Sequence, residues 1–221
     1  MNKINCFVPF SGAAQAEKTV KGLQETGLVN NIYLLALPDV TENLPGCSTL
    51  HMQSIQSSTA MRDIAGHSDA EYTLIYTKYT TLELGLFALE RMIHIAEDSG
   101  AGMVYADRYQ VKEGKQTNAP VIDYQFGSLR DDFDFGSILL FSTSAFTYTA
   151  DKLYKRYQYA GLYNMRLFIA VNYSIIHINE YLYTEVETDT RKSGEKQFDY
   201  VDPKNREVQL EMEAACTEYL K

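Results

Sequence analysis

The stretch "YTLIYTKYTTLELG", Tyr72–Gly85, decides the fold. It begins with an apolar run, Tyr72–Tyr76, that is typical of a buried strand and stops abruptly at the polar residues 77–80. Apolar residues then recur at spacings of four and three up to Gly100, which predicts a helix with one apolar face. The members of that face are Leu82, Leu86, Leu89, Ile93 and Ala96. A strand followed by a helix predicts an α/β protein, in which ligands and catalytic groups gather at strand ends.

The flanking segments repeat this alternation of strand and helix. An N-terminal apolar run closed by Pro9 is followed by a helix from Ala13 to Thr26. We predict four strands, the first three in parallel contact because helical crossovers link them: Ile4–Val8, Ile32–Ala36, Thr73–Tyr76 and Met103–Tyr105. Further along we expect a strand at 138–142, a helix at 162–171, a strand at 173–185 and a closing helix. Because the alternation loosens after residue 107, we expect a mixed central sheet in a single α/β domain, 1–221.

Composition narrows the class of protein. With 45% hydrophobic and 22% charged residues, the 221-residue chain can bury one full-sized core. Its 20 basic and 29 acidic residues give a net charge of −9, which repels a phosphate backbone, so we do not expect nucleic acid as a partner. No apolar run is long enough to cross a bilayer and the N-terminus has no signal core, which predicts a cytoplasmic protein. The three cysteines are too far apart for a disulfide framework or a zinc site, so we expect inert thiols.

Turn-forming and polar residues follow the first and second predicted strands. Pro9, Phe10 and Ser11 lead into the first helix, where backbone N–H groups can meet an anion or a nucleotide. Asp39 follows the second strand, where a carboxylate can accept hydrogen bonds from ribose hydroxyls or a base. Both places also fit ordinary turn chemistry, a βα turn in one and an Asx turn in the other. The chain contains no Walker P-loop, dinucleotide-binding glycine motif, nucleophile elbow or zinc-protease motif.

The succession of these pieces resembles the family-two glycosyltransferases, which have the GT-A (nucleotide-diphospho-sugar transferase) fold. That family carries Ala-Arg-Asn and then Ala-x-Gly-x-Tyr before its third strand, and "AMRD" at 60–63 and "SDAEY" at 68–72 stand in similar places. The stretch "FDFGSILLFSTSAF" at 133–146 is similar to the acceptor-side strand and loop, and residues 163–185 to the closing helix and strand. The resemblance implies a three-layer α/β sandwich with a nucleotide-diphospho-sugar donor and a glycan or other hydroxyl acceptor. It places the nucleotide over the carboxyl ends of the strands, against Pro9, Phe10, Ser11, Asp39, Arg62, Thr77 and Tyr79.

The chain departs from the family pattern at both acidic sites. Family members usually end the third strand with Asp-x-Asp, which holds a divalent cation on the donor diphosphate, but here the matching residues are Thr77 and Tyr79. Where inverting members carry an acidic base in the closing helix, the nearest match is Tyr163-Asn164, and an asparagine cannot take the proton. We therefore expect no metal cofactor.

Three functions remain open. A metal-independent glycosyltransferase, of full or weakened activity, would neutralise the diphosphate with Lys78 or with Arg191 and Lys192, and Asp107 or Asp134 would be its acidic catalytic group. A degenerate GT-A module would bind a sugar nucleotide, a following domain or a second copy of itself without turnover. A sugar nucleotidyltransferase would need a Gly-rich loop with Arg or Lys after the first strand, which "PFSGAAQAEK" does not provide. For each of these cations and aspartates, a solvated surface charge or a simple turn is the competing interpretation.

Overall fold

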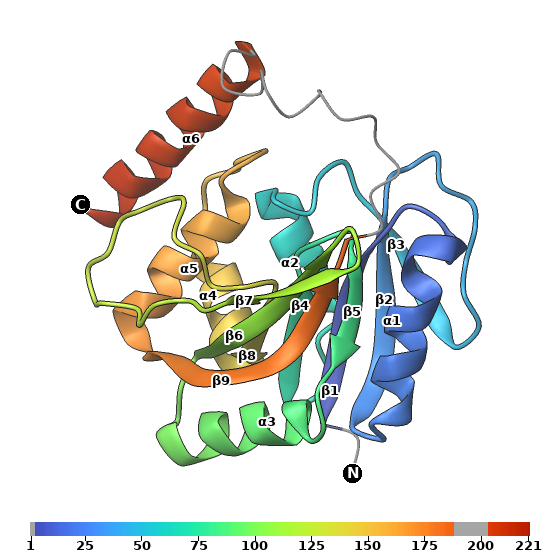
Figure 1. Cartoon of the computed structure of the whole chain (residues 1–221). Helices are drawn as coiled ribbons and strands as arrows, with labels where there is room; N and C mark the ends of the chain where they lie inside the picture. Colours follow the sequence, from blue (N-terminus) through green and yellow to red (C-terminus); the bar gives the residue numbers. More distant parts are fainter. Residues whose placement is uncertain (1–2, 188–202) are drawn as a thin grey trace.

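The computed structural model describes residues 3–187 and 203–221, and these residues fold around one mixed β-sheet (Figure 1). Within them the sheet has nine strands, in the order β3-β2-β1-β4-β8-β6-β9-β5, with β7 paired to β6. The strands are β1 Ile4–Phe10, β2 Val29–Ala36, β3 Cys47–His51, β4 Tyr72–Tyr76, β5 Thr81–Leu84, β6 Met103–Lys112, β7 Lys115–Ala119, β8 Ile138–Ser142 and β9 Ile175–Val186. The helices are α1 Ala13–Glu25, α2 Ser58–Gly66, α3 Ala88–Ser99, α4 Thr143–Lys152, α5 Gly161–Asn172 and α6 Pro203–Tyr219.

The N-terminal half of the sheet is parallel, as the sequence predicts. β1 is buried along its whole length and lies between β2 and β4, both of which run parallel to it. Its sequence, apolar apart from Asn5, fits a strand that is covered on both faces. The parallel contact of the first three predicted strands is confirmed, and their carboxyl ends meet at one edge of the sheet. The sequence does not predict β3, a short edge strand on β2 whose residues are only partly buried or exposed.

The other half of the sheet has strands in both directions. β8 runs antiparallel to its neighbours β4 and β6, so β6 points in the same direction as β4. β9 pairs in parallel with β6, and β5 closes the sheet antiparallel to β9. As a result, the residues that follow Ala106 on β6 lie at the same edge of the sheet as the end of β4. The mixed central sheet is therefore confirmed.

The helix that the sequence predicts from Leu82 onward is wrong in its first turns. Thr81–Leu84 form the strand β5, and the helix α3 begins only at Ala88. Leu86 is 87% exposed and contributes to no buried helix face. The spacing of Leu82 and its neighbours fits a strand as well as a helix, and pairing with the free edge of β9 decides between them. The other predicted members of the face are buried on α3: Leu89, Ile93 and Ala96.

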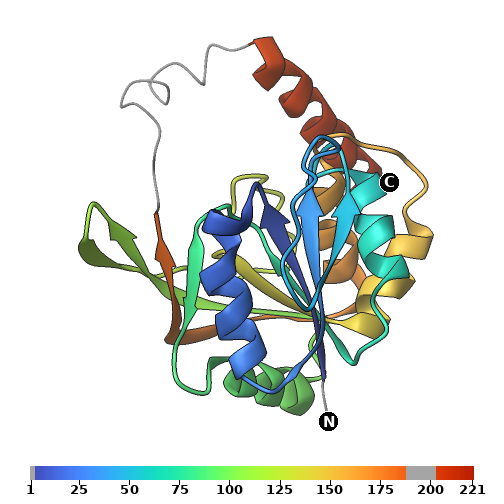
Figure 2. The same ribbon diagram turned by 90° about the vertical axis from the view of Figure 1, so that its right-hand side faces the viewer.

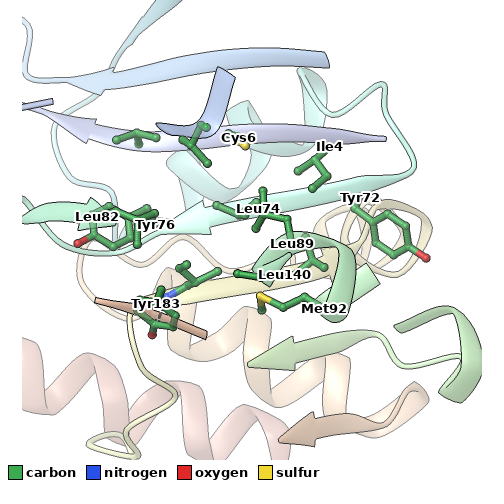
Figure 3. Close-up of a cluster of buried hydrophobic side chains, with 14 of the residues drawn as sticks. Ile4, Cys6, Tyr72, Leu74, Tyr76, Leu82, Leu89, Met92, Leu140 and Tyr183 are labelled. Carbon is green, nitrogen blue, oxygen red and sulfur yellow. Dashed lines mark hydrogen bonds between the residues drawn. The ribbon is translucent and has the colours of Figure 1, made fainter. Parts of the chain in front are cut away.

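Helices cover both faces of the sheet, which confirms the three-layer arrangement. α1 and α3 pack on one face, and α2, α4 and α5 pack on the other (Figure 2). Figure 3 shows part of the first core, where Leu74 of β4 and Leu140 of β8 lie near Leu89 and Met92 of α3. Burying a side chain of this size stabilises the fold by about 1.5–3 kcal/mol. These contacts hold β4 and β8 together on the α3 face of the sheet.

The C-terminal helix α6 packs against α5 (Figure 1). Ala215 of α6 is fully buried in a small cluster with Tyr163 and Leu167 of α5. Glu211 of α6 accepts hydrogen bonds from the backbone N–H groups of residues 158, 159 and 160, at 3.0, 2.7 and 3.2 Å, directly before α5 begins. α6 therefore fixes the start of α5. Like every other helix in the described part of the chain, it is too short or too polar to cross a membrane.

Candidate functional site

A cavity of about 410 Å³ opens at the carboxyl edge of the sheet. The end of β4 and residues of β6 and β8 form its base, and the segment 131–136 before β8, together with α5 and α6, forms its walls. The charged side chains that line it are Lys78, Arg108, Asp131, Asp132, Asp134 and Arg166. Lys78 and Asp134, two predicted catalytic residues from distant parts of the sequence, thus lie in one cavity.

The end of β4 carries a backbone hydrogen bond to the start of β8 and the positively charged side chain of Lys78. The backbone N–H of Thr77 donates to the carbonyl oxygen of Ser137 at 2.9 Å, which ties the end of β4 to the start of β8. Lys78 is exposed, lines the cavity, and forms no salt bridge with any carboxylate in residues 3–187 or in the described part of α6. Tyr79 is 43% exposed, and its partial burial raises the pKa of the hydroxyl, so that it stays neutral. This strand end therefore offers a positive charge and neutral hydroxyls.

Arg108, on β6, is a cavity residue that the sequence reasoning misses. Its side chain is 7% exposed, and its Nε lies 2.7 Å from Oε1 of Glu185, a carboxylate on β9 that is 6% exposed. Its Nη2 donates to Oδ2 of Asp134 at 3.0 Å. Burial works against the charged guanidinium, but the charges of Glu185 and Asp134 outweigh it and raise the pKa of Arg108. The only signal in the sequence is a basic residue directly after the apolar part of a strand.

Local contacts hold the aspartates of the segment 131–136. Asp134 is 57% exposed, and its Oδ1 accepts a hydrogen bond from the backbone N–H of Gly136 at 2.8 Å. Asp132 instead forms a bidentate pair with Arg130, and these hydrogen bonds lower the pKa of its carboxyl. Gly136 has φ 74°, and a Cβ there would collide with the hydroxyl of Tyr183, so only glycine fits. Asp134 is the aspartate that contacts the buried cation of the cavity.

Arg166 and Tyr163 of α5 hold the loop that leads into this segment. The two terminal nitrogens of Arg166 donate to the carbonyl oxygens of Ser128 and Arg130, each at 2.7 Å. The hydroxyl of Tyr163 donates to the carbonyl oxygen of Leu129 at 2.6 Å, and the guanidinium of Arg166 lies 4.9 Å from the centre of the Tyr163 ring. An arginine inside the otherwise apolar helix "LYNMRLFIAV" is a signal that could have marked this role in the sequence.

Two positions singled out in the sequence do not line the cavity. Asp107 is 1% exposed. Its Oδ1 accepts a hydrogen bond from the backbone N–H of Val121 at 2.8 Å and lies 2.9 Å from Nε2 of His177. Asn164, which matches the family's acidic base, is fully buried. The contacts of Asp107 hold the chain after β7 against β6 and β9.

Most residues predicted to bind a nucleotide follow strands at the carboxyl edge. They are Pro9, Phe10, Ser11, Asp39, Thr77 and Tyr79. Pro9 and Phe10 are buried at the end of β1, whereas Ser11 and Asp39 are exposed. The exposed pair can therefore meet a ligand that lies over this edge.

Arg62 and the late basic pair are not placed with them. Arg62, on α2, donates a hydrogen bond to the carbonyl oxygen of Leu153 and lines a separate hollow between α2 and α4. The structure therefore does not bring Arg62 into the cavity of Lys78. Arg191 and Lys192 lie outside the described residues.

A second hollow, of about 480 Å³, lies at the ends of β2 and β3. Its walls include Pro38, His51, Ser57 and Glu211. Glu211 and the next residue of α6, Met212, line the second hollow and the first cavity respectively. α6 thus borders both the cavity and this hollow.

The residues at the end of β4 do not fit a divalent cation. Mg²⁺ and similar ions prefer carboxylate oxygens, and Thr77 and Tyr79 carry none. Asp132 and Asp134 are each already paired with an arginine. Among the described residues, no three His, Cys, Asp or Glu side chains are grouped so that they could hold a metal ion.

Comparison with solved structures identifies the fold. Residues 1–349 of S. aureus TarS in complex with UDP-GlcNAc match with a TM-score of 0.60 and 11% identity, over 96% of this chain and 66% of that one. The fold is GT-A-like. TarS 1–349 in complex with UDP matches with a TM-score of 0.59 and 9% identity, over 84% of this chain and 60% of that one.

The GT-A-like fold is also shared with 4-diphosphocytidyl-2C-methyl-D-erythritol synthase from Anaerococcus prevotii DSM 20548. That structure matches with a TM-score of 0.52 and 7% identity, over 93% of this chain and 99% of that one. No protein-family model and no curated protein matches the sequence. This chain spans only 60–66% of the TarS 1–349 structures. At such low identities, the likeness establishes the GT-A-like fold and nothing finer.

Proposed function

We propose that the protein transfers a sugar from a nucleotide-diphospho-sugar donor to a hydroxyl acceptor without a divalent metal. One observation carries the proposal: an exposed lysine, Lys78, stands in the cavity at the end of β4 of a GT-A-like sheet. The TarS structures of similar fold are complexes with UDP-GlcNAc and UDP, which supports a sugar nucleotide as the class of ligand.

Lys78 would stabilise the leaving group. As the bond between the anomeric carbon and the donor's phosphate oxygen breaks, the bonding electrons leave with the nucleoside diphosphate. An ammonium group beside that oxygen neutralises the growing negative charge, as a metal ion does in other enzymes. A single donor of this kind typically lowers the barrier by about 3–4 kcal/mol.

Asp134 would accept the proton of the acceptor. It lines the same cavity, and its side chain is 57% exposed. As the acceptor oxygen bonds to the anomeric carbon, its proton passes to the carboxylate. Asp107 is less suited to this role, because it is 1% exposed and engaged with Val121 and His177.

Binding and turnover assays test the proposal. We expect calorimetric titration with UDP, GDP and their sugar conjugates to identify at least one ligand, and its transfer or hydrolysis to persist in excess EDTA. Lys78→Ala should lower the rate by about 100-fold, since it removes the charge at the leaving group. The matched control is Lys21→Ala, because Lys21 is an exposed lysine on α1, 74% exposed, far from the cavity lining.

Three results would speak against sugar transfer of this kind. Strict dependence on Mn²⁺ or Mg²⁺ would contradict the assignment of Lys78. Binding of a donor without hydrolysis under any metal condition, with Lys78→Ala silent, would support a non-catalytic sugar-nucleotide module instead. Absence of binding to the whole panel would leave only a structural role.

A further inference from the structure

Arg108 is a buried cation with more hydrogen-bond donors than partners. Its contact with Glu185 is an ion pair at 2.7 Å but not an aligned hydrogen bond. Its Nη1 is also buried and has no partner in the described part of the chain. Among the described residues, only its Nη2 donates a hydrogen bond, to Asp134. A guanidinium carries five N–H groups, and donors that stay unpaired when buried are costly.

The two carboxylates beside Arg108 differ in how easily they can leave it. Glu185 is 6% exposed and lies in a β-strand, and its Oε2 also accepts a hydrogen bond from Gln110 at 3.1 Å. Asp134 is 57% exposed and lies in the cavity wall outside any strand or helix. An anion entering the cavity can therefore displace Asp134 from Arg108 while Glu185 stays in place.

Displacement of Asp134 would free two neighbouring N–H groups of Arg108 for bidentate binding. Nη2 would lose its hydrogen bond to Asp134, and Nη1 already has no partner among the described residues. Two N–H groups of one guanidinium match two oxygens of a phosphate group. Lys78 lines the same cavity, forms no salt bridge with any residue that the structure describes, and adds a second positive charge.

We propose that this cavity is a phosphate-binding site in which Asp134 pairs with Arg108 until the phosphate of the ligand takes its place. The ligand class is a phosphate or diphosphate group, held by Arg108 and Lys78. The source of that group rests on the proposed function: it is either the diphosphate of the donor or a phosphate carried by the acceptor. Asp134, released from Arg108, is then free to accept a proton.

The test is calorimetric titration of the whole chain with inorganic pyrophosphate at low ionic strength. Asp134→Asn keeps an oxygen for the N–H of Gly136 but removes the competing charge, so we expect it to bind pyrophosphate about three- to tenfold more tightly. Asp132→Asn is the matched control: it makes the same change of charge in the same cavity, where Asp132 pairs with Arg130 instead. We expect the affinity of this control to change less than twofold.

Two further variants locate the cations. Arg108→Lys keeps a positive charge beside Glu185 but loses the planar guanidinium with its paired N–H donors. Lys78→Met removes an exposed charge. Each should weaken pyrophosphate binding by about tenfold. Circular dichroism and thermal unfolding of the variants show whether the fold is retained. No pyrophosphate binding by the wild type and Asp134→Asn, or equal gains for Asp134→Asn and Asp132→Asn, would overturn the proposal.

Competition with UDP separates the source of the phosphate from the existence of the site. Displacement of pyrophosphate by UDP, with the same gain in Asp134→Asn, identifies the donor diphosphate; UDP binding without displacement identifies a phosphorylated acceptor. If pyrophosphate binds as expected but no sugar nucleotide does, the phosphate site stands and the proposed transferase function fails. If sugar nucleotides bind and pyrophosphate does not, the phosphate site fails and the transferase function stands.

Discussion

Replacing Arg108 by methionine should destabilise the protein strongly, because it leaves the buried carboxylate of Glu185 without its ion-pair partner. The side chain of Glu185 is 6% exposed and, within the part of the chain that the structure describes, would keep only its hydrogen bond from Gln110. Removing one partner of a buried ion pair typically costs about 3–5 kcal/mol. Replacing both partners by apolar side chains of similar size is often neutral, so Arg108→Met combined with Glu185→Met should lie within about 1–2 kcal/mol of the wild type. The coupling energy of the pair should then be at least about 2 kcal/mol.

Urea unfolding followed by circular dichroism measures these differences as shifts of the midpoint at constant slope. The control is the pair of Arg91 and Glu180, whose side chains are 44% and 45% exposed. Arg91→Met should leave the midpoint nearly unchanged, since water solvates the remaining carboxylate. A cost below about 1 kcal/mol for Arg108→Met, or a double variant as unstable as the single one, would refute the reasoning. A stable double variant that no longer binds pyrophosphate would show that the pair serves binding rather than folding.

Two further predictions concern packing and thiol chemistry. Gly161→Ala should lower the midpoint of thermal unfolding sharply, because a Cβ at the start of α5 would overlap the backbone of Ser57 before α2. The control, Gly66→Ala, should be neutral or stabilising, because nothing lies within 4 Å of the added Cβ. Equal effects of the two substitutions would count against the close contact of α2 and α5. Burial raises the pKa of the Cys47 thiol to about 11, and fully buried Cys6 is shifted in the same direction. At pH 8 about one Cys47 side chain in a thousand is then a thiolate. Both thiols should therefore resist Ellman's reagent in the native protein and react only after unfolding. Rapid labelling of either thiol in the native protein would contradict this.

Six strands could be predicted at least in part, because each contains a run or an alternation of apolar residues: β1, β2, β4, β6, β8 and β9. β1, β4 and β8 are buried on both faces, so their sequences contain no polar alternation and resemble little else. β3 and β5 could not be predicted, because a short, half-exposed strand depends on the neighbour with which it pairs. The sequence analysis also did not predict the helix α4, since Thr143–Lys152 is rich in residues that favour strands or caps.

The candidate site could be predicted only in part for a similar reason. Lys78 attracts attention in the sequence because it directly follows an apolar strand. Arg108 stands out little, and Arg166 only by its apolar neighbours in the helix, because each lies inside a strand or a helix, where a charged residue is ordinarily exposed. Their importance comes from burial: they are 6% and 5% exposed, and both contact the loop that encloses the cavity.

The sequence by itself determined the local elements, the α/β class and the chemistry at each strand end, because apolar periodicity and turn residues act over a few neighbouring positions. Only the tertiary structure decided that Lys78, Arg108 and Asp134 share one cavity. Their proximity depends on β8, which enters the sheet between β4 and β6 and runs antiparallel to both. That insertion brings the segment before β8 to the carboxyl ends of its two neighbours. Pairing between strands so distant in the chain follows from the packing of the whole core, and no short stretch of sequence encodes it.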